Sequence, residues 1–282
     1  MGRFSSTISR TIAASALVLI ACSGDGEHAA TAPAPLVDDC SGTDIYGGSP
    51  AYDGTWADAV VMVSAPDHVC SGALVGPRLV VTARHCVGEQ TDPDGKVYCS
   101  ASHAGDSQVG PDLDPSTLVV STGYDGLGAS SFGVQILHED GDRLCNEDIA
   151  FLVLNDELPG TPLAFSSAPP FGGEKLQVAG YGLRPGGCYG QRYVKGDVAV
   201  IATGPGTLAS GKGVLGTNEI ESDLSFCHGD SGGPAIGPDG AIVGLVERGG
   251  DCEANEGHVY TTTAAFGALA TSAYAAANAF GK

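Results

Sequence analysis

Basic residues are scarce in this chain of 282 residues, which has 13 Lys and Arg against 33 Asp and Glu and a formal net charge of -20. A field of this sign repels the phosphates of nucleic acids and the headgroups of anionic lipids. We therefore expect no nucleic acid as a partner, and no membrane surface held by charge. The excess of acid is typical of a soluble, self-repelling surface.

A membrane-spanning run is also missing, because the apolar stretch at 11–20 holds only ten residues. That length is too short to cross a bilayer comfortably and matches the core of a signal peptide. The run ends at 19–22 with Leu-Ile-Ala-Cys, which resembles the bacterial lipobox, cut just before a lipid-bearing cysteine. Two or more acyl chains on Cys22 would anchor the protein stably. Ordinary signal cleavage, with Cys22 incidental, is the alternative.

The cysteine count favours lipidation of Cys22. The chain has nine cysteines, and without Cys22 an even set of eight is left for four disulfides in an oxidising compartment. We expect a lipoprotein signal peptide over 1–21, a small and polar tether over 22–44, and one folded domain over 45–282. The expected location is the bacterial cell envelope, reached by secretion across the inner membrane. Whether the protein sits in the outer membrane or is released stays open.

Short apolar stretches recur between turn signals, in a chain whose 43 glycines favour tight turns over long helices. They predict strands at 59–63, 79–82, 116–121, 134–137, 149–154, 176–179, 197–202 and 241–246. Apolar residues at three- and four-residue spacing predict a single helix over 266–280. The fold class is therefore all-β, barrel or sandwich, with one C-terminal helix.

Three segments carry residues suited to nucleophilic catalysis. His85 follows a strand and precedes Cys86, Asp148 opens an apolar strand, and Ser231 lies in the sequence Gly-Asp-Ser-Gly-Gly-Pro. A serine hydroxyl needs a base to remove its proton, an imidazole can take and return that proton, and a buried carboxylate fixes the imidazole tautomer. The amides of Gly229 and Ser231 could bind a developing oxyanion, worth roughly 100- to 1000-fold per donor.

Each segment alone has an ordinary structural explanation as core, turn or loop. Together, in the order His, Asp, Ser, they resemble the trypsin and chymotrypsin family of serine proteases, whose motifs read TAAHC, DIAL and GDSGGP. The resemblance covers about 45–280 and implies two antiparallel β-barrels with the active site in the cleft between them. It implies a monomeric serine endopeptidase without a cofactor, acting on proteins or peptides through an acyl-enzyme. Arg84 stands where the family usually has alanine.

The sequence Ile-Tyr-Gly-Gly at 45–48 matches the family's mature start, Ile-Val-Gly-Gly. The resemblance implies cleavage before Ile45, after which the freed amine pairs with Asp230. Removing one partner of such a buried pair typically costs about 3–5 kcal/mol, so cleavage could act as a switch. The segment 22–44 would then be tether plus propeptide. The activating enzyme is not identified, since a trypsin-like one would not cut after Asp44.

The resemblance places the primary substrate pocket at four residues. Ser225 forms its floor, where the lack of aspartate disfavours cleavage after Lys or Arg, and Phe226 fills part of it. Gly249 lines one wall, and His258 lies near the rear wall and favours a small or acidic side chain, unless it is an ordinary surface histidine.

The family's Ser-Trp-Gly wall appears here as Glu-Arg-Gly at 247–249. The glutamate adds like charge near Asp148, which leaves open a weak or silent homologue that acts as a surface binding lipoprotein. A serine esterase of this fold is a separate alternative.

Family positions imply disulfides Cys70–Cys86 and Cys227–Cys252. Cys40, Cys99, Cys145 and Cys188 then allow three connectivities, of which we favour Cys99–Cys145 with Cys40–Cys188. The interval between His85 and Asp148 is longer than the roughly 45 residues of the worked triad.

That interval carries acidic residues that could hold calcium, although a solvated loop is the favoured interpretation and no metal site is assigned. These are Asp92, Asp94, Asp106, Asp112 and Asp114. Three further histidines have no partnered spacing and are interpreted as surface or core residues: His68, His103 and His138.

Overall fold

A computed structural model describes residues 47–92, 97–102, 105–183, 190–211, 213–249, 252 and 257–280. Several sequence predictions lie outside these residues: the signal peptide and tether, and the positions Cys22, Cys40, Ile45, Asp94, His103 and Cys188. Among the described residues, no helix is long and apolar enough to cross a membrane.

Six strands close into a first antiparallel barrel in the order β2-β3-β4-β9-β8-β7. Their bounds are β2 Val60–Ser64, β3 Val69–Gly76, β4 Leu79–Thr82, β7 Val119–Ser121, β8 Ser130–His138 and β9 Ala150–Leu154. Side chains alternate across each strand, so β9 buries Leu152 and Leu154 with one core cluster and Phe151 and Val153 with another. Burial on both faces explains why β9 has an unbroken apolar sequence.

Six strands also form the second barrel, which the pairing of β11 with β14 closes. Their bounds are β10 Lys175–Gly180, β11 Tyr193–Thr203, β14 Glu219–Ser222, β15 Pro234–Ile236, β16 Ile242–Arg248 and β17 His258–Thr262. The short strand β1, Ser49–Pro50, pairs with β11 at the edge of this sheet. The all-β prediction is confirmed, and the architecture is two barrels rather than a sandwich.

Two small two-stranded sheets and short 3-10 turns complete the regular structure. The sheets pair β5 (Gly88–Gln90) with β6 (Val109–Asp112), and β12 (Gly206–Thr207) with β13 (Val214–Leu215). The 3-10 turns are η1 Trp56–Ala59, η2 Arg84–Cys86, η3 Pro115–Thr117 and η4 Ala264–Phe266.

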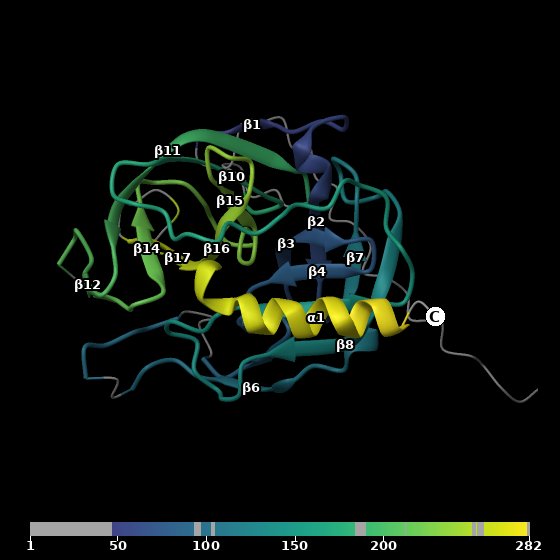
Figure 1. The fold of residues 1–282 in the computed structure, drawn as a ribbon, viewed down its shortest axis with the longest axis horizontal. Coiled ribbons are helices and arrows are strands. Elements are labelled where there is room, and N and C mark those ends of the chain that lie inside the picture. The colour runs from purple at the N-terminus through teal and green to yellow at the C-terminus, as the bar shows by residue number, and fades with distance from the viewer. Residues whose placement is uncertain are drawn as a thin grey trace, which may run out of the picture. The chain divides into compact units, whose positions relative to one another are not determined.

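The C-terminal helix α1, Gly267–Phe280, follows η4 and packs on the first barrel, against β4, β8 and β9 (Figure 1). Its buried residues Leu269 and Ala273 join the core cluster that contains Phe151. The helix predicted from the 3–4 spacing is therefore confirmed. The chain returns from the second barrel to cover the outside of the first.

One predicted strand is partly wrong. The segment 116–121 was expected to be a strand throughout, but β7 begins only at Val119, because η3 occupies Pro115–Thr117. Asp114 caps this turn by accepting from the Ser116 amide, and proline at its first position fits a helical start.

Candidate active site

Adjacent strands bring His85 and Asp148 together. His85 lies in η2, directly after β4, and Asp148 lies just before β9; β4 and β9 pair with Thr82 opposite Ala150. The Nδ1 atom of His85 is 2.6 Å from Oδ2 of Asp148, and the His85 backbone amide donates to Oδ1 at 2.9 Å. Asp148 is completely buried. Because a carboxylate only accepts, Nδ1 carries the hydrogen, and Nε2 is left to take up a proton.

The loop of Ser231 is tied to the segment that carries His85. The Ser71 amide donates to the Ser231 carbonyl at 2.8 Å, and Sγ of Cys86 lies 3.6 Å from the same oxygen. The disulfide Cys70–Cys86 joins β3 to η2. Within the described residues, no hydrogen bond links the Ser231 hydroxyl to His85. The structure thus brings the two segments side by side without that last contact.

Glycine is required directly after Ser231. Gly232 has φ +77°, and a Cβ there would lie 2.1 Å from Oγ1 of Thr82 and 2.5 Å from the carbonyl oxygen of Ser71. The tight approach of the serine loop to β3 and β4 therefore depends on the missing side chain.

Two carbonyl groups of the serine loop accept hydrogen bonds from other segments of the chain. The His228 carbonyl accepts from the Leu183 amide at 2.6 Å, and the Gly229 carbonyl accepts from the Ser71 hydroxyl at 2.9 Å. In a trans peptide the N–H points opposite to the preceding carbonyl, so the Gly229 amide is directed away from Leu183. In the described part of the chain neither this amide nor that of Ser231 donates to a protein acceptor. Both amides are therefore available as the oxyanion donors expected from the sequence.

Asp230 is buried beneath the same loop. Its carboxylate accepts from the amides of Gly182 at 2.8 Å and Cys227 at 2.9 Å. Burial nevertheless raises the pKa of Asp230 to about 7, since two amides only partly replace water. A cation at this site would stabilise the ionised carboxylate of Asp230. The resemblance to the family assigns this role to the Ile45 amine. Ile45 itself lies outside the described residues.

The residues expected to form the primary pocket do lie together. The hydroxyl of Ser225 is 2.7 Å from that of Tyr260 and is completely buried. The ring of Phe226 packs edge-on against His258, with centroids 4.5 Å apart. A Cβ on Gly249 would lie 2.8 Å from the Phe226 ring. Phe226 therefore fills the space between these walls. Because His258 is buried, its interpretation as a surface histidine is wrong.

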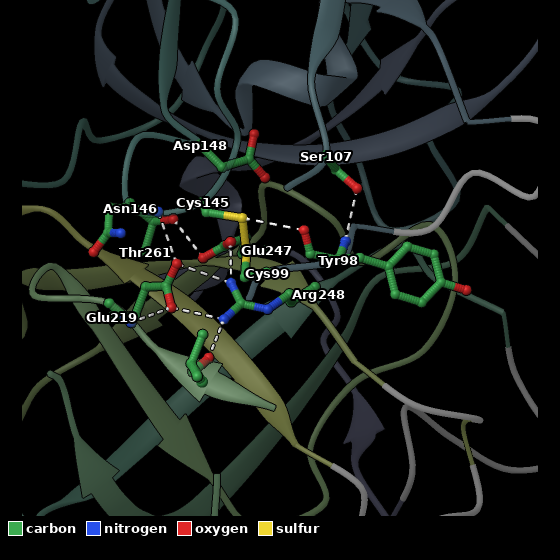
Figure 2. A network of polar contacts seen from close by, with 12 residues as sticks. Tyr98, Cys99, Ser107, Cys145, Asn146, Asp148, Glu219, Glu247, Arg248 and Thr261 are labelled. Carbon is green, nitrogen blue, oxygen red and sulfur yellow. Dashed lines mark hydrogen bonds and ion pairs between the residues drawn. A yellow bond between two sulfur atoms is a disulfide. The ribbon is translucent and has the colours of Figure 1, made fainter. Parts of the chain in front are cut away.

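Glu247, which the sequence analysis expects to add negative charge near Asp148, belongs to a buried ion-pair network (Figure 2). Arg248 pairs with Glu247 and donates to both oxygens of Glu219, at 2.9 and 2.7 Å. The other Glu247 oxygen accepts from Thr261 at 2.8 Å. Burial raises the pKa of Glu247 well above its usual value, Arg248 opposes this, and the charges of Glu219 and Asp148 add to the rise. Glu219 was missed in the sequence, because no local pattern marks it as a partner.

Disulfides are present at Cys70–Cys86, Cys99–Cys145 and Cys227–Cys252. The two pairs implied by the family and the favoured third pair are therefore confirmed, while Cys40 and Cys188 lie outside the described residues. Cys99–Cys145 fastens the long segment between His85 and Asp148 directly before the catalytic aspartate candidate.

Three acidic residues of that segment have separate partners. Asp112 pairs with Arg84 at 2.7 Å and with His138 at 3.1 Å, which gives His138 a partner that its spacing did not reveal. Asp114 caps η3, and Asp106 accepts from the Ser100 amide at 2.6 Å. These contacts give three of the acidic residues protein partners within the segment.

Comparison with known proteins places the whole arrangement in one family. The family model described as Trypsin matches residues 45–269. Trypsin iota of Drosophila melanogaster is 28% identical over 201 residues, covering 66% of this chain and 70% of its own. Trypsin zeta of Drosophila erecta is 26% identical over 213 residues, covering 67% and 69%. Mannan-binding lectin serine protease 1 of Mus musculus is 26% identical over 239 residues, covering 74% and 32%. The two barrels, the His85–Asp148 pair and the matched family model together show that this chain belongs to the trypsin family of serine proteases.

Proposed function

We propose that the protein is a serine endopeptidase that acts through His85, Asp148 and Ser231. The observation that carries this proposal is the buried Asp148 carboxylate, which accepts two hydrogen bonds from His85 and leaves Nε2 of its imidazole free to act as a base. The Ser231 loop is fastened to the adjacent segment by the Ser71 amide.

The reaction proceeds in two halves. Ser231 Oγ attacks the scissile carbonyl while Nε2 of His85 takes the hydroxyl proton, and the carbonyl electron pair moves onto an oxygen held by the amides of Gly229 and Ser231. The C–N bond breaks as His85 gives its proton to the leaving amine, and an acyl-enzyme forms. Water then repeats the sequence, with His85 as base, and releases the acid and the serine.

The finer features of the proposal concern processing. The chain is made as a zymogen, activated by cleavage before Ile45 so that the new amine pairs with Asp230. It is secreted behind its signal peptide and anchored through lipid on Cys22. Burial of Asp230 and the raised pKa of its carboxyl support the first feature, and the sequence at 19–22 supports the second.

Covalent labelling by a fluorophosphonate probe tests the activity. We expect label on Ser231 of the wild-type chain and none on Ser231→Ala, with the N-terminus of the labelled form read from the same sample. Labelled chains that begin at Ile45 support zymogen activation, whereas labelled chains that begin at Cys22 contradict it. No label, even with Ile45 freed, overturns the enzyme and favours a silent homologue that binds partners as a surface lipoprotein.

A further inference from the structure

Arg248 is a buried cation held between two buried carboxylates (Figure 2). Arg248 donates two hydrogen bonds to the Glu219 carboxylate and forms an ion pair with Glu247. It also donates to the Val214 carbonyl at 2.8 Å. Both glutamates are at most 2% exposed. Burying charges costs solvation that only good pairing offsets, so such a cluster is weak evidence for a role in stability. Its place in the fold indicates another role.

Glu219 connects Arg248 to the chain that leads into Asp148. Its Oε1 atom accepts from the Asn146 amide at 2.7 Å, and Asn146 lies two residues before Asp148. Asn146 has φ 71°, a left-handed conformation that asparagine adopts more readily than most residues. The Asn146 side chain also accepts from the Asn218 amide at 3.2 Å. The approach to Asp148, which lies in the first barrel, is thus fixed from β14 of the second.

Glu247 connects Arg248 to Asp148 by charge. Burial raises the pKa of Glu247, and the charge of Asp148 raises it further, so the two carboxyl groups repel. Arg84 also interacts electrostatically with Asp148, but its ion-pair partner is Asp112. Arg248 is the cation that pairs with Glu247 and so limits the negative potential at the His85–Asp148 pair.

We propose that Arg248 is a positioning residue of the active site: through Glu219 it holds the Asn146–Asp148 segment, and through Glu247 it offsets the second carboxylate beside Asp148. This inference rests on the proposed protease function. It also explains why Glu247 and Arg248 depart from the family pattern together. Without Arg248, the glutamate beside Asp148 would be an unpaired buried charge.

The test compares Arg248 with a second buried arginine. Arg192 is completely buried and pairs with Asp53 and Asp58, both at 2.9 Å, in the segment around η1. The full chain and its processed form are prepared as wild type, Arg248→Met, Arg248→Lys, Arg192→Met and Arg192→Lys. Two quantities are measured as a function of pH. One is the rate of fluorophosphonate labelling, normalised to the amount of folded protein, and the other is the chemical shift of the downfield His85 Nδ1–H proton.

We expect Arg248→Met to label about tenfold more slowly or worse, because small displacements of catalytic groups are costly. Because burial raises the pKa of Glu247 and Arg248 opposes this rise, loss of the guanidinium leaves the Glu247 carboxyl to titrate beside the His85–Asp148 pair. The pH midpoint of labelling and the Nδ1–H titration should therefore both shift from their wild-type values, by about half a unit or more. Arg248→Lys should recover most of the rate, and the Arg192 variants should match the wild type in both quantities.

The outcomes separate the two proposals. If the wild type does not label, the protease function itself is wrong. If the wild type labels and Arg248→Met behaves like Arg192→Met, the positioning role is overturned. Should Arg248→Met fail to fold, Glu219→Met keeps the Arg248–Glu247 pair and removes the acceptor for the Asn146 amide, together with the bonds from Arg248 and the Gly216 amide to Glu219. Slow labelling by that folded variant supports the proposal, and labelling at the wild-type rate overturns it.

Discussion

Two hydrogen bonds from His85 hold the Asp148 carboxylate in a fixed orientation. One bond comes from the ring and one from the backbone, so the carboxylate cannot turn without losing one of them. An amide in place of this carboxylate can keep the backbone bond, but it presents an N–H or a neutral oxygen to Nδ1. The preference for the tautomer with a free Nε2 is then lost.

For Asp148→Asn we expect a folded protein whose kcat is about 10,000-fold lower. Steady-state hydrolysis of a peptide and the rate of fluorophosphonate labelling measure the loss. Asp112→Asn, which disturbs the partner of Arg84 instead, is the matched control and should retain most activity. A loss below about tenfold in Asp148→Asn would show that Asp148 does not orient the base.

Phe226 should determine which residue is accepted at the cleaved bond. Its ring packs against His258 and Tyr260 and closes the space beside Gly249. We expect the wild type to cleave after small side chains. Phe226→Ala should raise the relative rate for Leu or Phe at that position by about tenfold or more, in a peptide-library digest read by mass spectrometry. Phe171→Ala, at an exposed site, should leave the preference unchanged. An unaltered preference in Phe226→Ala would contradict the assignment of the pocket.

At the scale of elements, two strands that the sequence did not reveal, β14 and β17, have buried polar residues. Strand β14 reads Glu-Ile-Glu-Ser and β17 reads His-Val-Tyr-Thr-Thr, yet every residue of both is buried. Glu219 is stabilised there by Arg248, which lies at the end of β16. Such pairing comes from distant parts of the chain, so hydropathy patterns miss it. Strands β2, β4 and β9 are predictable because their apolar sequences suffice.

The residues of the candidate active site also fall into two groups: those that the local sequence marks and those that it does not. His85, Asp148 and Ser231 are each marked by neighbouring residues, so the local sequence is enough to propose them. Glu219 and Asn146 have no local mark, because their roles arise only where β14 meets the segment before Asp148. The packing of Phe226 on Gly249 likewise depends on two loops that meet only in the fold.

The disulfide Cys99–Cys145 should matter for both stability and activity. It closes a separation of 46 residues and ends one residue before Asn146. For the double variant Cys99→Ser, Cys145→Ser we expect a free energy of unfolding lower by about 2–4 kcal/mol, measured by urea denaturation. Labelling of Ser231 should also slow at temperatures where the variant is fully folded. Unchanged labelling would show that the anchor on Glu219 holds the segment without the disulfide.

At the scale of the whole molecule, the acidic surface and the buried acid Asp230 respond differently to pH. Most of the 33 acidic residues contribute to the net charge of -20, which keeps molecules apart. Asp230 instead is buried with two backbone amides as donors, and burial raises its pKa to about 7. The pH dependence of stability should therefore report whether a cation has reached this carboxylate.

In the chain that still continues upstream of Ile45, folded Asp230 holds its proton up to about pH 7, whereas the unfolded group releases it near pH 4. Between these values the folded state binds more protons, so the free energy of unfolding should fall as pH rises, by up to about 4 kcal/mol.

Urea denaturation of Ser231→Ala, which cannot cleave itself, measures this slope. Adding Asp230→Asn should make this slope smaller, and what remains includes the contribution of Glu247, whose pKa is also raised. In the chain cut before Ile45, the new amine should keep Asp230 ionised, so the slope should be reduced there as well. Equal slopes in all three forms would show that Asp230 is not the receptor of the activating amine.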